Sequence, residues 1–141
     1  MGAWDYGIFD DDTAYDFTDE IKEDARAFFK SSFEQALAAE SLDYDACHRV
    51  TVSAAYMDNL LNGTTYRTDS HEASDESNVN LFGKLQPGLH VEDLRGLAID
   101  ALEKVLGKTS ELNELWSDNE DLYPKWTTSI RELMARLKVA R

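Results

Sequence analysis

Three aspartates near the start of the chain have the spacing of metal ligands. Asp10, Asp12 and Asp16 resemble the beginning of a calcium-binding loop. The EF-hand pattern also requires an oxygen ligand at the fifth position and glycine at the sixth, and here these positions hold Ala14 and Tyr15. The pattern fails, and helix capping explains the acids. The sequence therefore predicts no metal site and no cofactor.

Two further pairs of residues are of types that bind zinc. His71-Glu72 begins like a zinc-protease helix, but the residue four positions after the histidine is Asp75 instead of a second histidine. Cys47 and His48 are adjacent, and neighbouring side chains on a helix point about 100° apart, so they rarely share a metal. We interpret Cys47 as a small packed thiol.

No recognised catalytic motif occurs in the sequence. There is no Gly-x-Ser-x-Gly elbow, no phosphate-binding glycine loop and no dinucleotide fingerprint. We therefore expect a protein that is not an enzyme. A site assembled only in three dimensions leaves no motif, so a catalytic site around Cys47, His48 and His90 stays open as an alternative.

The charge of the chain is strongly negative and unevenly distributed. The formal net charge is -14, from 28 acidic and 14 basic residues. Nucleic acids and anionic membranes are repelled by such a surface, whereas a basic protein is attracted. Residues 1–24 contain nine acids and one lysine, and residues 125–141 contain five basic residues and one glutamate. If the two ends meet, they neutralise each other; if they do not, the protein has one acidic pole.

These observations predict a non-catalytic, acidic protein-binding module, and within that class an immunity protein or antitoxin that neutralises a basic toxin. We expect the partner to be contacted by acidic residues and one tyrosine near the N-terminus. These are Asp5, Tyr6, Asp10, Asp11, Asp12, Asp16, Asp19 and Glu20. The alternative is a regulatory or scaffold protein whose partner is neither a toxin nor basic. It would use residues 62–90 or an apolar patch.

Apolar residues recur at helical spacing along most of the chain. After the acids at 10–12, Ala14, Phe17 and Ile21 mark one buried face of a first helix. Further helices are expected at 24–39, 43–61, 91–107 and 110–116, and a last one begins near Pro124. Residues 62–90 are rich in glycine and polar side chains and predict a long irregular loop, with short extended pieces at 64–68 and 79–82. The chain is therefore expected to be all-α, a single domain over residues 1–141 with about six helices.

The first residues, Met1-Gly2-Ala3-Trp4, and the later Phe9-Asp10-Asp11-Asp12 resemble a family of uncharacterised bacterial proteins that carry a domain of unknown function. Members begin Met-Gly-Ala-Trp-Gly and continue to Phe-Asp-Asn-Asp. The segments Ser110-Glu111-Leu112 and Leu115-Trp116 resemble the family's later Ser-Glu-Leu…Leu-Trp. This sequence has Asp5 and Asp11 where the family has glycine and asparagine. The resemblance implies a fold and no established activity.

The aromatic residues predict core positions, and the single cysteine bears on the compartment. We expect Trp4 and Phe9 to plug the helical bundle and Trp116 and Trp126 to anchor its core. One cysteine excludes an intramolecular disulfide, which fits a reducing compartment. No membrane span or secretory signal is apparent, and we expect a cytoplasmic protein.

Overall fold

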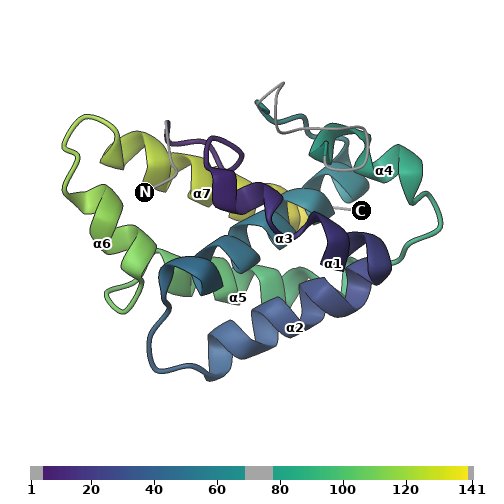
Figure 1. The fold of residues 1–141 in the computed structure, drawn as a ribbon, viewed down its shortest axis with the longest axis horizontal. Helices are drawn as coiled ribbons and strands as arrows, with labels where there is room; N and C mark the ends of the chain where they lie inside the picture. The colour runs from purple at the N-terminus through teal and green to yellow at the C-terminus, as the bar shows by residue number, and fades with distance from the viewer. Residues whose placement is uncertain (1–4, 69–77, 140–141) are drawn as a thin grey trace.

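The computed structural model describes residues 5–68 and 78–139, which form one helical domain without strands (Figure 1). The all-α prediction is confirmed. Within this part of the chain the elements, in order, are the 3-10 helix η1 (Asp12–Tyr15), α1 (Thr18–Glu23), α2 (Ala25–Ala38), α3 (Tyr44–Asn62), η2 (Val79–Leu81), α4 (Phe82–Leu85), η3 (Glu92–Leu94), α5 (Arg95–Val105), α6 (Glu111–Ser117) and α7 (Tyr123–Val139). Seven α-helices are present there instead of about six.

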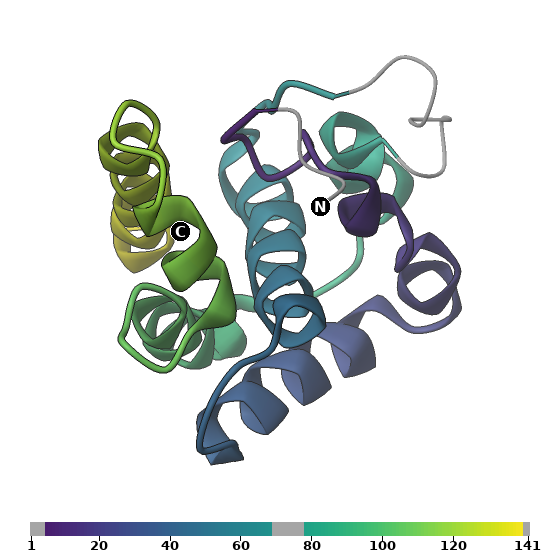
Figure 2. The same cartoon turned by 60° about the vertical axis from the view of Figure 1, so that its left-hand side comes forward.

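Helix α3 is the centre of the domain. It packs against α2, α4, α5, α6 and α7, and Figure 2 shows it between α7 and α1. The sequence predicts one buried stripe on this helix, formed by Val50, Ala54, Met57 and Leu61. The structure instead buries every residue from 50 to 59 and leaves Leu61 half-buried. A helix surrounded by other helices is buried on all its sides.

Side-chain caps set the ends of the two longest N-terminal helices. Asp24 accepts a hydrogen bond from the Ala27 N–H at 3.1 Å, and Asp43 accepts one from the Ala46 N–H at 2.8 Å. Helix α3 ends at Gly63, whose φ of 73° is the left-handed conformation that glycine adopts without a steric penalty. The predicted helices 24–39 and 43–61 are therefore confirmed to within one residue.

The first predicted helix is interrupted. Asp11 accepts a hydrogen bond from the Thr13 N–H at 2.9 Å and begins η1, and α1 starts only at Thr18. The cap is thus Asp11, one of the three acids at 10–12 that were expected to cap the first helix. Phe17 lies at the break and is buried together with Ala14, as the spacing predicts.

The prediction of one irregular loop over residues 62–90 is wrong at its C-terminal end. Val79–Leu81 is a 3-10 helix and α4 follows it directly, where an extended piece was expected. The reason is burial, since Val79 is fully buried and Phe82 is 6% exposed. Residues 64–68 have no regular structure. Residues 69–77 of the predicted loop, including His71 and Glu72, lie outside the described residues.

Aromatic rings join the N-terminal segment to the helices. The ring centroid of Tyr56 on α3 lies 6.0 Å from Phe9, 6.3 Å from Phe29 and 4.9 Å from Phe82. Phe9 is 1% exposed, which confirms its predicted place in the core. Trp4, the second expected plug, lies outside the described residues.

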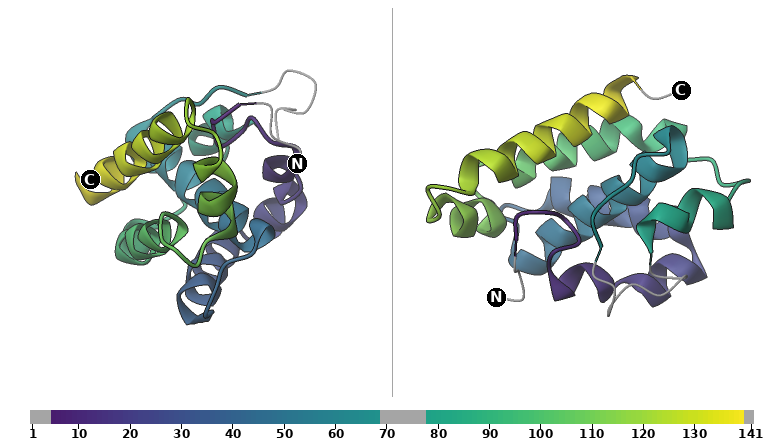
Figure 3. Two further views of the ribbon diagram at one scale, coloured as in Figure 1. Left: turned by 90° about the vertical axis from the view of Figure 1, so that its left-hand side faces the viewer. Right: turned by 90° about the horizontal axis from the view of Figure 1, so that it is seen from above.

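Helix α7 lies against α5 and α3, and Figure 3 shows α7 beside α5. Its predicted inward face of Trp126, Ile130, Leu133 and Leu137 is buried throughout. Trp116 on α6 stacks on Trp126 with ring centroids 6.5 Å apart, and both predicted anchors are in the core. No helix within the described ranges is long and apolar enough to cross a membrane.

Candidate functional site

The acidic residues expected to form one partner surface are divided by the fold. Asp10 and Asp11 are each only 2% exposed, so both carboxylates point into the protein and are not available at its surface. Asp5 is half-buried. The exposed members of the set are Asp16, Asp19 and Glu20, at the start of α1. Nothing is described for the side chain of Asp12.

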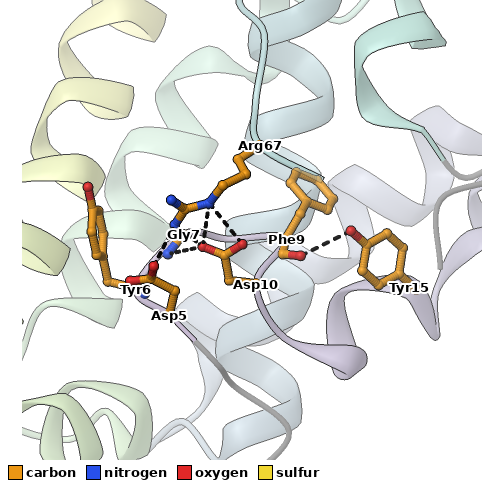
Figure 4. Close-up of polar contacts among 7 residues, drawn as sticks. All are labelled: Asp5, Tyr6, Gly7, Phe9, Asp10, Tyr15 and Arg67. Carbon is orange, nitrogen blue, oxygen red and sulfur yellow. Dashed lines mark hydrogen bonds and ion pairs between the residues drawn. The ribbon is translucent and has the colours of Figure 1, made fainter. Parts of the chain in front are cut away.

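Asp10 is held by an arginine that is distant in the sequence. Nε of Arg67 lies 3.1 Å from each carboxylate oxygen of Asp10, and its NH2 group also contacts Oδ2 (Figure 4). The same guanidinium lies 3.2 Å from Asp5 and over the ring of Tyr6. The Gly7 N–H donates to Asp10 at 3.1 Å. These contacts fasten residues 5–10 to the segment that follows α3.

Asp11 lies in a second cluster, against the N-terminal half of α3. The Tyr44 hydroxyl donates to Oδ2 of Asp11, and Nε2 of His48 lies 3.3 Å from the same oxygen. The rings of Tyr44 and His48 are 4.5 Å apart. Burial alone would raise the pKa of Asp11, but the contacts with His48 and the Thr13 N–H outweigh it, and the pKa lies below its usual value.

The His48 ring is buried without a hydrogen bond. Its side chain is 6% exposed, and neither ring nitrogen has a partner in hydrogen-bond geometry. The 3.3 Å approach to Asp11 is therefore an electrostatic contact without hydrogen-bond alignment. Buried polar atoms are nearly always hydrogen-bonded, so an imidazole whose polar contact with Asp11 is an ion pair without hydrogen-bond alignment is unusual.

A small cavity adjoins this imidazole. It has a volume of about 10 Å³, and its walls include Tyr6, Asp11, His48, Trp116 and Trp126. Residues 5–8 form another part of the wall and are themselves half-buried, so the cavity lies just beneath the N-terminal segment. A space of this size holds one group as large as a water molecule.

The residues of the enzymatic alternative do not converge. Sγ of Cys47 is 3.3 Å from Oγ of Ser110, and burial raises the pKa of this thiol. His48 instead contacts Asp11 and Tyr44. His90 is at the surface, with its side chain 85% exposed, and its carbonyl oxygen accepts a hydrogen bond from Arg26. No group of three or more His, Cys, Asp and Glu residues within the described ranges could hold a metal ion.

A buried carboxylate on α3 has no counterpart among the predicted site residues. Asp58 is fully buried and accepts hydrogen bonds from Tyr66 at 2.6 Å, from Arg136 at 2.8 Å and from Asn62 at 2.8 Å. A carboxylate that directly follows Met57 of the predicted buried stripe is itself a signal, because a buried charge requires partners. The identity of those partners could not be read from the sequence.

Helices α1 and α7 lie apart, although residues 5–8 of the acidic end line one cavity together with Trp126 of α7. Figures 2 and 3 show α1 and α7 on opposite sides of α3. Residues 16–24 carry five exposed carboxylates and one lysine. Glu20 lies 3.2 Å from Arg49, while the ion pairs among described residues leave Asp16, Asp19 and Glu23 without a cation. These five carboxylates form an exposed acidic patch, which we call the α1 face and define by Asp16, Asp19, Glu20, Glu23 and Asp24.

The family described as Domain of unknown function (DUF4259) matches residues 2–129, so this helical domain belongs to a family defined by sequence without an assigned activity. The chain belongs to that family, as its opening residues predict. The match covers residues 62–90 and ends within α7, before residues 130–141. No curated protein and no solved structure matches the chain.

Proposed function

We propose that this protein is a non-catalytic module that binds a basic protein through its α1 face, and that it acts in the cytoplasm as an immunity protein or antitoxin. The observation that carries the proposal is the separation of charge. The carboxylates of the α1 face are exposed, and helix α1 lies on the opposite side of α3 from the basic helix α7. An exposed patch with an excess of negative charge attracts a basic partner and speeds association.

The buried residues support a binding role over catalysis. The cavity beside His48 has a volume of about 10 Å³, which is far below the several hundred Å³ of ordinary ligand pockets. Cys47 is enclosed and its thiol has a raised pKa, which disfavours the nucleophilic thiolate.

Affinity capture at low and high salt tests the proposal. The tagged protein is expected to retain one stoichiometric basic partner at low salt and to release it at high salt, since screening weakens exposed charge pairs. The triple variant Asp16→Asn, Asp19→Asn, Glu23→Gln is expected to lose most of the binding. Inhibition of the captured protein's activity would then establish the immunity role.

A matched variant separates the position of the charge from its amount. The control is a second triple variant that also removes three negative charges, from exposed positions on α5 and α7: Asp100→Asn, Glu103→Gln, Glu132→Gln. It is expected to bind as the unaltered protein does. Equal loss in both triple variants, or binding that is insensitive to salt, would reject the α1 face as the docking surface.

One observation favours the second candidate, a regulatory or scaffold protein with a partner that is not basic. A groove of about 270 Å³ lies between α1 and α4, and its walls include Ile21, Phe82 and Leu85. Leu85 is 55% exposed, which is unusual for a large apolar side chain beside a groove. Leu85→Ser is expected to abolish binding only under this second proposal.

A further inference from the structure

The end of α3 carries a pair of residues whose chemistry the binding proposal does not use. Asn62 is the last residue of the helix and Gly63 follows it, and among the six asparagines of the chain Asn62 alone precedes a glycine. Asparagine before glycine is the pair most prone to deamidation, because glycine has no side chain to hinder attack by its main-chain nitrogen on the asparagine amide. Both residues are exposed, so hydroxide and water reach them.

The folded conformation holds this pair in an unreactive geometry. The Gly63 N–H donates to the carbonyl oxygen of Asn59 at 2.8 Å, so the attacking nitrogen is engaged. Nδ2 of Asn62 donates to Oδ1 of Asp58 at 2.8 Å and lies 3.4 Å from the carbonyl oxygen of Arg136. Closing a five-membered ring also requires the main chain of Asn62 to leave the helical ψ of about −42°. The reaction therefore needs the last turn of α3 to open.

The last turn of α3 can open while the rest of the helix stays formed. Helix ends fray at a lower free energy than helix centres, which stay closed until larger parts of the protein unfold. A Cβ atom at position 63 would meet nothing within 4 Å, so no neighbour among the described residues packs on that side of the turn. The fold therefore slows the reaction of this pair without preventing it.

The reaction product places a second negative charge against a buried one. Asp58 has no exposed surface, and its Oδ1 accepts the hydrogen bond from Asn62. Its Oδ2 accepts from Tyr66 and from Arg136 on α7. An aspartate at position 62 has no donor for Oδ1, and like charges four positions apart on a helix destabilise it. Isoaspartate also adds a methylene group to the main chain where α3 ends, so either product weakens the network that joins α7 to α3.

We propose that Asn62 is a deamidation site, that opening of the end of α3 sets its rate, and that its product loosens α7 from α3. The Gly63 nitrogen loses its proton to hydroxide and bonds to Cγ of Asn62, and the Cγ–Nδ2 bond breaks to release ammonia. Water then opens the succinimide ring; cleavage at Cγ gives aspartate, and cleavage at the main-chain carbonyl carbon gives isoaspartate. Solvent water is the only reactant consumed. The site is independent of the α1 face and of the docking proposal.

Peptide mapping of the intact protein by mass spectrometry tests the reaction. Samples are kept in mildly alkaline buffer with and without guanidinium chloride, digested, and searched for the mass gain that marks replacement of an amide nitrogen by oxygen. We expect the gain in the peptide that contains Asn62, and none in those that contain Asn113 or Asn119, which precede glutamate. The folded protein should react at least about tenfold more slowly than the unfolded protein, since only the open fraction reacts. Equal rates, or no product in the folded protein after several weeks, would overturn the proposal.

Three substitutions at position 62 test the consequence for the fold. Asn62→Asp reproduces one product, and it is expected to lower the urea midpoint and to speed hydrogen exchange of the α7 amides more than that of the α2 amides. Asn62→Ser, which loses the amide without adding a charge, should lower the midpoint less. Asn62→Gln keeps an amide but closes the larger ring slowly, so this control should gain no mass. Equal midpoints for Asn62→Asp and Asn62→Ser would overturn the role of the added charge. If Asn62→Asp does not fold, the deamidated fraction separated from aged protein by ion exchange takes its place.

Discussion

Arg136 on α7 donates a hydrogen bond to Asp58 on α3 at 2.8 Å, and Asp58 has no exposed surface. The Tyr66 hydroxyl donates to the same oxygen at 2.6 Å. Burial and the neighbouring charge of Asp58 raise the pKa of Tyr66, so this phenol keeps its proton and remains a donor. One carboxylate thus ties α7 and the segment after α3 to the central helix.

Arg136→Met is expected to destabilise the protein strongly. The substitution keeps most of the apolar stem but leaves Asp58 with neutral donors only. Stranding one partner of a buried ion pair costs about 3 kcal/mol at the lower end of the usual range. Urea unfolding followed by tryptophan fluorescence measures the loss. Arg131→Met, exposed on the same helix, is the control and should change the free energy of unfolding by less than about 0.5 kcal/mol.

A double substitution tests whether the loss comes from the stranded charge. Asp58→Asn combined with Arg136→Met removes both charges, so it should cost less than the sum of the two single substitutions. Strict additivity would show that Asp58 and Arg136 do not interact in solution.

The packing of Gly7 against Asp10 gives a second prediction. A Cβ atom at position 7 would lie 2.5 Å from Oδ2 of Asp10, closer than real Cβ contacts come. Gly7→Ala is therefore expected to displace Asp10 from Arg67 and to cost about 1–3 kcal/mol. Urea unfolding and the rate of proteolysis within the first residues report the two effects.

At Gly96 the substitution of glycine by alanine is expected to have the opposite effect on stability. A Cβ atom there meets nothing within 4 Å, and the residue lies in α5. Gly96→Ala is expected to stabilise the protein by about 0.5–1 kcal/mol, because alanine loses less backbone entropy in a helix. If Gly7→Ala were also neutral or stabilising, Gly7 would not be packed closely against Asp10 in solution.

Local signals in the sequence predict the local structure well. Asp24 and Asp43 cap the helices that follow them, because a cap depends only on residues two or three positions away. The apolar spacing of α7 predicts its buried face for the same reason. The break between η1 and α1 was missed, since Phe17 is buried in either arrangement and the pattern does not distinguish them.

The candidate site depends on contacts between distant residues, which leave no local pattern. Asp10 and Arg67 are 57 positions apart, and Asp58 and Arg136 are 78 apart. Asp10 and Asp11 look like surface acids in the sequence because only the tertiary partners Arg67, Tyr44 and His48 reveal that they are buried. Val79–Leu85 looked irregular because its helix-forming tendency is weak, and burial of Phe82 determined its structure.

The lowered pKa of Asp11 predicts a dependence of stability on pH. A carboxylate whose pKa is lower in the folded state stabilises the protein above its unfolded pKa of about 3.9. That contribution is lost as the pH falls through the folded value. Urea midpoints measured between pH 7 and pH 2.5 should therefore fall more steeply for the unaltered protein than for Asp11→Asn.

An exposed aspartate is the control for that pH dependence. Arg26 lowers the pKa of Asp93 to about 2, but the Asp93 side chain is 64% exposed and solvent screens the pair. Asp93→Asn should therefore leave the acid dependence of the midpoint nearly unchanged. If Asp93→Asn flattened the curve as much as Asp11→Asn, the buried cluster would not be the source.

Cys47 should be unreactive in the folded protein. Its side chain points from α3 toward Ser110 and is fully buried. Burial raises the pKa of the thiol, so little of the reactive thiolate forms at neutral pH. A thiol reagent such as dithiobis-nitrobenzoate should react only as fast as the protein opens, and the rate should rise with urea in step with unfolding. Arg136→Met, which lowers stability without touching this region, should react faster by the same factor as its loss of stability. Rapid labelling of the unaltered protein without urea would show that the packing of α6 on α3 opens locally, and the enclosed thiol would then have to be reconsidered as an accessible group.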